Sequence, residues 1–129
     1  MASFTLLVTQ SPLGSCAHLQ ALDFAQAVLN AGHQIERVFF YQDAVYVGLN
    51  GQTPIQGQKS LAAQWLELAR LHAFPLELCI ANALRRGIAD AKEQARYTLP
   101  SATLVEGFVL SGLGALASAC KESDRVVQF

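Results

Sequence analysis

The sequence has little charge. Asp, Glu, Lys and Arg together make up 15% of its 129 residues, and the formal net charge is −1. A module that binds nucleic acid by itself usually carries a basic excess, so we expect no direct contact with nucleic acid. Hydrophobic residues reach 52%, which excludes a disordered chain because disordered segments combine few apolar residues with high net charge.

Long apolar runs and paired cysteines are also absent. No apolar run approaches the ~20 residues of a membrane-spanning helix, and Met1–Phe4 lacks the basic residues that open a secretory signal peptide. The three cysteines, Cys16, Cys79 and Cys120, are an odd number at wide spacing, which fits neither a disulfide framework nor a zinc site. We therefore expect a cytoplasmic protein with reduced thiols, no membrane contact and no bound metal.

Strand-like segments alternate with helix-like segments along the chain. The strand-like segments are residues 4–9, 34–41, 75–80, 104–111 and 125–129. The helix-like segments are residues 15–31, 60–72, 90–97 and 112–120. This alternation is typical of βαβ units. We predict an α/β fold, a three-layer α/β/α single domain over residues 1–129 with a mainly parallel sheet of about five strands. Residues 42–58 predict a surface loop with one short helical turn.

Hydrophobic spacing predicts which faces of the first two helices are buried. In residues 15–31 the apolar positions assigned to one face are Leu19, Leu22, Ala25, Ala27 and Leu29. In residues 60–72 they are Leu61, Trp65, Leu68 and Leu71. Ser60 precedes the second helix and is a preferred capping residue. We expect Trp65 in the core or at an interface.

The apolar fraction is high for so small a chain. Ordinary globular domains have about 45–50% apolar and about 25% charged residues, and a chain of this length buries about two thirds of its unfolded surface. Two interpretations remain. We favour an apolar surface that meets another subunit, and the alternative is an unusually apolar core in a monomer.

Most familiar site motifs can be set aside. Gly112–Ala117 matches G-x-G-x-x-G/A, but too few residues follow it for the acidic residue that a dinucleotide site places about 20 positions on. We interpret its glycines as a strand-to-helix turn. The sequence has no P-loop, no H-E-x-x-H and no G-x-S-x-G. His18, His33 and His72 stand singly near helix ends and are interpreted as packing or dipole features.

Cys79 is the one candidate nucleophile. It falls at the carboxyl end of the third predicted strand, the edge where functional groups of parallel sheets collect. If the residues after it turn helical, their backbone N–H groups favour a thiolate over a thiol, and so do the cationic side chains of Arg85–Arg86 a few positions on. The equal alternative is a small buried hydrophobe. Cys16 follows the first strand and could face the same crevice, whereas Cys120 ends the last helix and is interpreted as inert.

Several blocks of the chain resemble the DsrE/TusD family of sulfur-relay proteins. The blocks are Phe24–Ala27, Gly32–His33, Val38–Tyr41, Cys79–Gly87 (CIANALRRG), Ser111–Leu116 (SGLGAL) and Asp124–Phe129 (DRVVQF). The resemblance covers essentially the whole chain, and the cysteine-to-RRG block is its specific part. The ending is more similar to the TusD branch than to the DsrE proteins of sulfur oxidisers.

The resemblance implies a sulfurtransferase subunit that needs no redox cofactor. It implies that Cys79 is catalytic, accepting sulfane sulfur as a persulfide from a TusA-like donor and passing it to a TusE-like acceptor. The implied destination is 2-thiouridine at the wobble position of certain tRNAs. The implied assembly is a dimer of heterotrimers with TusB-like and TusC-like subunits.

Two alternative functions stay open beside this one. One is a DsrE-type sulfur carrier that serves dissimilatory sulfur oxidation, and the other is a non-catalytic structural subunit, although Cys79 in its motif counts against the latter. The chain departs from the family in residues 42–58, and at Asn82, where a small apolar residue is expected. Cys16 and Cys120 lie outside the motif. Arg85–Arg86 is either a solvated pair or a patch that receives an acidic partner.

Overall fold

The computed structural model describes residues 1–129 and contains one sheet of five strands. The strands are β1 (Ser3–Val8), β2 (Gln34–Phe40), β3 (Leu76–Cys79), β4 (Phe108–Ser111) and β5 (Arg125–Gln128). They lie in the order β4-β3-β2-β1-β5, and each neighbouring pair is parallel. The predicted α/β architecture is confirmed. Because all five strands run the same way, their carboxyl ends meet at one edge of the sheet.

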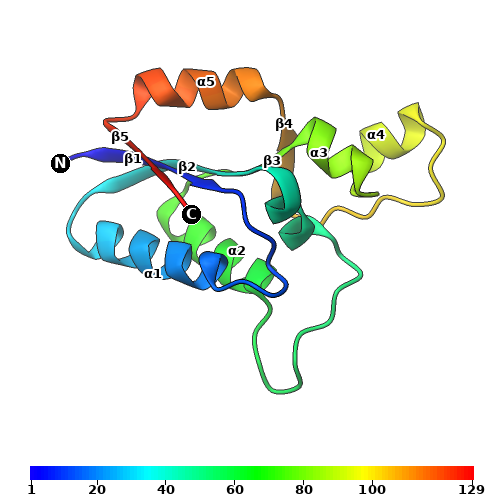
Figure 1. The fold of residues 1–129 in the computed structure, drawn as a ribbon, viewed down its shortest axis with the longest axis horizontal. Helices are drawn as coiled ribbons and strands as arrows, with labels where there is room; N and C mark the ends of the chain where they lie inside the picture. Colours follow the sequence, from blue (N-terminus) through cyan, green and yellow to red (C-terminus); the bar gives the residue numbers. More distant parts are fainter.

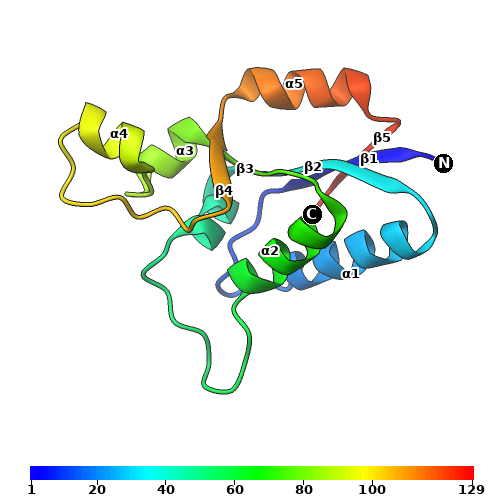
Figure 2. The ribbon, with the colours of Figure 1, turned by 180° about the vertical axis from the view of Figure 1, so that it is seen from behind.

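Helices cover both faces of the sheet. They are α1 (Ala17–Asn30), α2 (Leu61–His72), α3 (Ile80–Arg85), α4 (Ala91–Arg96), α5 (Leu113–Glu122) and the 3₁₀ helix η1 (Gln42–Gly48). Figure 1 shows α1 and α2 on one face and α5 on the other, and Figure 2 shows α3 and α4 beside the β3–β4 side. The long loop between η1 and α2 projects from the rest of the molecule (Figure 1). None of the helices combines the length and the apolar character needed to cross a membrane.

Aromatic side chains fill the core between the sheet and α1–α2. Trp65 and Phe40 are fully buried and meet edge to face, with ring centroids 5.4 Å apart. His18 stacks on Phe40 at 5.7 Å. Its Nδ1 accepts the indole N–H of Trp65 at 3.3 Å, so its Nε2 carries the proton and donates to the Gln10 carbonyl at 3.0 Å. Burial lowers the pKa of His18, and the bond to Gln10 opposes that shift only in part.

The opposite face of the sheet, beneath α5, contains a buried ion pair. Arg37 of β2 pairs with Glu77 of β3 at 3.0 Å, and Glu77 is buried. The same guanidinium donates to the Ala115 carbonyl in α5 at 3.4 Å and lies 3.7 Å from Glu122. α5 therefore packs over a buried ion pair as well as through its apolar residues Leu116 and Ala119, whereas α1 and α2 pack on aromatic rings. Val109, the register partner of Glu77, is 50% exposed on β4.

The buried face of α1 agrees with the predicted one in part. Ala25 is fully buried and Leu22 and Leu29 pack partly buried against the core, as predicted, whereas Leu19 and Ala27 are exposed. Ala21 and Val28 are buried although the prediction did not include them. The reason is size, because small side chains on the inner face let a helix lie close to the sheet. The prediction used hydrophobicity alone and therefore placed Leu19 on the buried face, but its side chain is half exposed.

The end of α2 also differs from prediction. Leu61 and Trp65 pack inward as expected, but Leu71 is 76% exposed. α2 ends before Ala73, which has the left-handed φ of 57°, and Phe74 directly after it is buried. The predicted cap is confirmed, because Ser60 Oγ accepts the N–H of Ala63 at 3.1 Å.

The fourth strand is shorter than predicted. Residues 104–107 precede β4, which starts at Phe108 opposite Leu76, the first residue of β3. The N–H of Leu104 bonds the Ala89 carbonyl instead. Gly107 then takes a φ of 103°, which side-chain-bearing residues rarely adopt, and turns the chain into the strand. At the other end of β4, Gly112 directly precedes α5, which confirms the predicted strand-to-helix turn.

Candidate active site

Cys79 lies at the carboxyl end of a central strand. All four residues of β3 are buried because β2 and β4 flank the strand and helices cover it. The predicted strand, residues 75–80, ends one residue early, because Ile80 begins the short helix α3 immediately after Cys79. α3 is only six residues long. Gly87, with a φ of 77°, ends the turn and lets the Ile88 N–H return to the Ala83 carbonyl at 2.9 Å.

The thiol of Cys79 is enclosed and receives one hydrogen bond. The residue is 1% exposed. Its side chain accepts no hydrogen bond from the backbone N–H groups of α3, so the expected contact between the sulfur and these groups is wrong. The donor is the side chain of Asn82, whose Nδ2 lies 2.9 Å from Sγ. The sulfur therefore meets a neutral amide donor at hydrogen-bond distance.

Arg86 holds Asn82 from the other side. Its guanidinium donates to the Asn82 carbonyl at 3.0 Å and reaches Oδ1 at 3.4 Å. Arg86 Nε also donates to Asp43 Oδ1 of η1 at 2.9 Å. The arginine predicted to act on the thiolate therefore contacts the sulfur's partner and the neighbouring helix, and not the sulfur itself.

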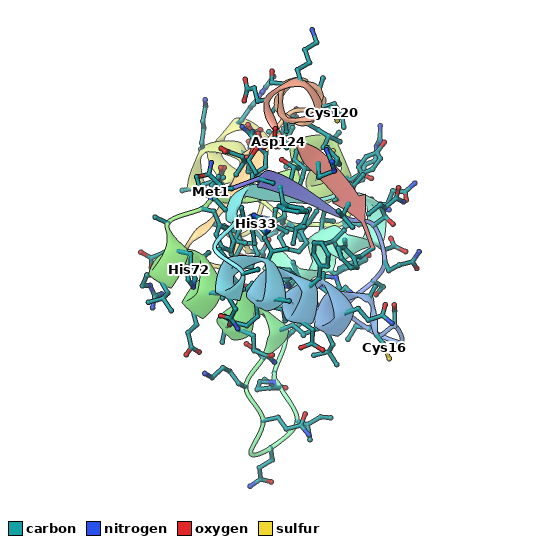
Figure 3. The ribbon with its side chains drawn as sticks, turned by 90° about the vertical axis from the view of Figure 1, so that its left-hand side faces the viewer. Met1, Cys16, His33, His72, Cys120 and Asp124 are labelled. Atoms are coloured by element: carbon teal, nitrogen blue, oxygen red, sulfur yellow. The ribbon has the colours of Figure 1, made fainter.

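The other two thiols lie away from this arrangement. Cys16 and Cys120 are both exposed. Figure 3 places Cys16 at the outer end of α1 and Cys120 on α5, on opposite sides of the sheet. All three cysteines are free, and neither Cys16 nor Cys120 forms a hydrogen bond with the buried Cys79.

A cavity of about 600 Å³ opens beside the site between α3 and α4. Ile80 and Ala81, the two residues after Cys79, line it together with Arg85 and Arg96. Glu93 also lines the cavity and has a buried Oε2 without a hydrogen bond. No group of three or more His, Cys, Asp or Glu side chains is arranged to hold a metal ion.

Asn82 is the partner of the Cys79 sulfur that the sequence analysis does not predict. The sequence marks it only as a departure from the family pattern. Its spacing was the available signal, because a residue three positions after a helix-capping residue reaches back to it, as in a capping box. Asp43 had no such signal, since 43 positions separate it from Arg86.

Comparison with known proteins identifies relatives over nearly the whole chain. The model of the DsrE/DsrF-like family matches residues 2–129. A protein named sulfurtransferase TusD from Photorhabdus laumondii is 45% identical over 98% of this chain and 97% of its own length. One of the same name from Serratia proteamaculans is 43% identical over the full length of both chains.

A solved structure agrees with these sequence matches. The crystal structure of the ychN protein from E. coli superposes with a TM-score of 0.77 at 25% identity and covers 100% of both chains. Fold, family model and near-full-length relatives point the same way. The chain belongs to the DsrE/DsrF-like family and is a sulfurtransferase.

Proposed function

We propose that this chain is a sulfur-relay subunit whose Cys79 carries sulfane sulfur as a persulfide toward 2-thiolation of the wobble uridine of tRNA. The observation that carries the proposal is the near-full-length similarity to proteins named sulfurtransferase TusD. The placement of Cys79 supports it, because functional groups of parallel α/β sheets gather at the carboxyl edge.

The transfer is a balanced exchange that needs no cofactor. The Cys79 thiolate attacks the outer sulfur of a donor persulfide, and a new S–S bond forms at Cys79. The donor's own S–S bond breaks, and its electron pair leaves with the donor cysteine as a thiolate. An acceptor thiolate then repeats the step on the Cys79 persulfide. The chemistry is that of thiol–disulfide exchange, with sulfane sulfur as the group transferred.

Burial of Cys79 sets a condition on this exchange. At 1% exposure the sulfur is out of reach of a second cysteine in the isolated chain, so docking of a partner has to open the site. The cavity between α3 and α4 is lined by Ile80, the residue after Cys79, and not by Cys79 itself. An enclosed thiolate is also shielded from small oxidants that would convert it to sulfenic or sulfinic acid.

The proposed partners are TusB-like and TusC-like subunits, a TusA-like donor and a TusE-like acceptor. Exposed apolar side chains support an assembly. Leu13, Leu19 and Ile55 are each at least half exposed and line a second cavity beside the long loop. Large exposed apolar patches mark interaction surfaces in soluble proteins. Light scattering of the chain with and without the two subunits tests the assembly.

Mass spectrometry tests the sulfur transfer. The chain is incubated with a persulfide-loaded TusA-like donor and digested without reductant. We expect one added sulfur on the peptide that contains Cys79, and its loss on addition of a TusE-like acceptor. Sulfur found only on Cys16 or Cys120, or on no cysteine, contradicts the proposal. Reconstitution with tRNA then separates wobble thiolation from a role in sulfur oxidation, because only the former gives 2-thiouridine.

A further inference from the structure

Asn82 donates the only hydrogen bond that the Cys79 sulfur receives. We infer that Asn82 stabilises the thiolate form of Cys79 and thereby makes it a better leaving group when sulfur passes to the acceptor. The inference rests on the proposed function for its role in transfer, but the contact itself does not. Both residues are at least nine-tenths buried, at 1% for Cys79 and 8% for Asn82, so water screens the contact little.

The orientation of the Asn82 amide follows from its neighbour. A guanidinium has donors and no acceptor, so the amide oxygen has to face Arg86, which lies 3.4 Å from Oδ1. The amide nitrogen is then left for the sulfur. Arg86 is in turn fixed by Asp43 of η1. The order Asp43–Arg86–Asn82–Cys79 therefore presents an N–H to the sulfur, and Arg86 is a positioning residue.

Other charged groups near the site are already paired or make no contact with the sulfur. η1, β3 and β4 pack against α3. The titratable side chains on them are Asp43 and Tyr46 of η1 and Glu77 of β3. Asp43 pairs with Arg86, and Glu77 pairs with Arg37 at 3.0 Å. On α3 itself Arg85 makes no hydrogen bond to Sγ, which leaves the Asn82 amide as the polar group acting on it directly.

The two halves of the transfer respond differently to a stabilised thiolate. When Cys79 attacks a donor, a larger thiolate fraction is offset by lower nucleophilicity, since nucleophilicity falls as a thiol becomes more acidic. When the acceptor removes the sulfur, Cys79 is the leaving group, and stabilisation of its thiolate speeds the step. Loss of the Asn82 donor should therefore slow unloading by several-fold and change loading little.

The test measures alkylation in a chain where Cys79 is the only thiol, made by Cys16→Ser and Cys120→Ser. The rate of iodoacetamide reaction is recorded against pH for Asn82→Ala and Asn82→Asp. Both remove the donor, and the second keeps the shape of the side chain and an acceptor for Arg86. We expect the midpoint of the profile to rise by about one pH unit in Asn82→Ala, since hydrogen bonds to a charged form favour it, and by more in Asn82→Asp.

A matched control makes the Asn-to-Asp substitution at a position far from the sulfur. Asn30→Asp on the exposed end of α1 adds the same charge away from the sulfur and should leave the midpoint in place. Circular dichroism confirms folding, and if Asn82→Ala unfolds, Asn82→Leu, which also lacks the donor and adds no charge, takes its place. An unchanged midpoint in the folded Asn82 variants overturns the inference. Persulfide loading of Cys79 is measured separately. Absence of loading contradicts the proposed function, whereas an unchanged alkylation midpoint contradicts only the role of Asn82.

Discussion

Two cysteines of this chain occupy equivalent places in the fold and have different surroundings. Cys16 directly precedes α1 and Cys79 directly precedes α3, and each follows a parallel strand toward the same sheet edge. Cys79 is 1% exposed and accepts a hydrogen bond from Asn82, whereas Cys16 is exposed and accepts none. Three positions after Cys16 stands Leu19, whose side chain is half exposed and has no donor.

The difference shows that a place at the end of a strand does not by itself make a site. After Cys16, the first turn of α1 supplies His18 to the aromatic core. After Cys79, the first turn of α3 supplies Asn82 to the sulfur. The first turn of α1 packs in the core and the first turn of α3 contacts the thiol, although both follow a cysteine at the same edge of the sheet.

Exchanging the two thiols for serine gives the largest expected difference. Cys79→Ser should abolish sulfur loading from a persulfide donor, because a hydroxyl is not a nucleophile for sulfane sulfur at neutral pH. Cys16→Ser should load at the rate of the unchanged chain. Intact mass after incubation measures both. Equal loading of the two variants would break the comparison.

Burial should separate the two thiols in the folded chain. We expect Cys16 and Cys120 to react with a bulky maleimide at least about tenfold faster than Cys79, since reactivity requires access as well as a thiolate. In denaturant the three rates should converge. Peptide mapping after brief labelling measures them. Labelling of Cys79 as fast as Cys16 in the native state would show that its enclosure opens readily.

His18, in the first turn of α1 after Cys16, should make the stability of the fold depend on pH. His18 is neutral in the fold and its pKa is lowered by burial, whereas in the unfolded chain it titrates near its ordinary value of 6.5. Below that value the unfolded state binds the extra proton, so stability falls as pH decreases from 6.5 toward the folded pKa, at up to about 1.4 kcal/mol per pH unit.

Urea unfolding at several pH values measures this dependence. His18→Gln should lose the component of the slope between pH 6.5 and the folded pKa. His72→Gln changes an exposed histidine and should keep that component. A slope that is the same in all three proteins would mean that His18 titrates alike in the folded and unfolded chains.

The next prediction concerns Arg86, which contacts Asn82 and not the Cys79 sulfur. Arg86→Met frees the Asn82 amide to rotate and should raise the alkylation midpoint of Cys79 by less than Asn82→Ala does. Arg85→Met removes the same charge from the neighbouring position, which forms no hydrogen bond with Asn82, and should shift the midpoint less. Equal shifts would indicate that net charge, and not the hold on Asn82, is what matters.

The smallest effect is expected from a substitution that places an amide donor near Cys16. Leu19→Asn places an amide three positions after Cys16, as Asn82 stands after Cys79. With Cys79 and Cys120 changed to Ser, the alkylation midpoint of Cys16 should fall by well under one pH unit, because solvent screens an exposed contact. Leu19→Gln, whose amide sits one methylene further out, is the control. A rise in the midpoint would contradict the interpretation of the Asn82 contact.

The sequence by itself determined the elements and the candidate nucleophile. Alternating strand and helix patterns are local, so they predicted the parallel sheet, the Ser60 cap and Cys79 at the end of β3. The same local spacing could have pointed to Asn82, three positions after a residue that precedes a helix.

Tertiary structure decided what surrounds those elements. It left Leu19 and Leu71 in solvent and enclosed Cys79, because the distance between packed helix and sheet selects residues by size as well as by polarity. It also brought Asp43 to Arg86 across 43 positions of sequence. Spacing along a chain places residues on a helix or strand, but how that element packs against others depends on the whole fold, which determines whether Cys79 is enclosed and which group donates to its sulfur.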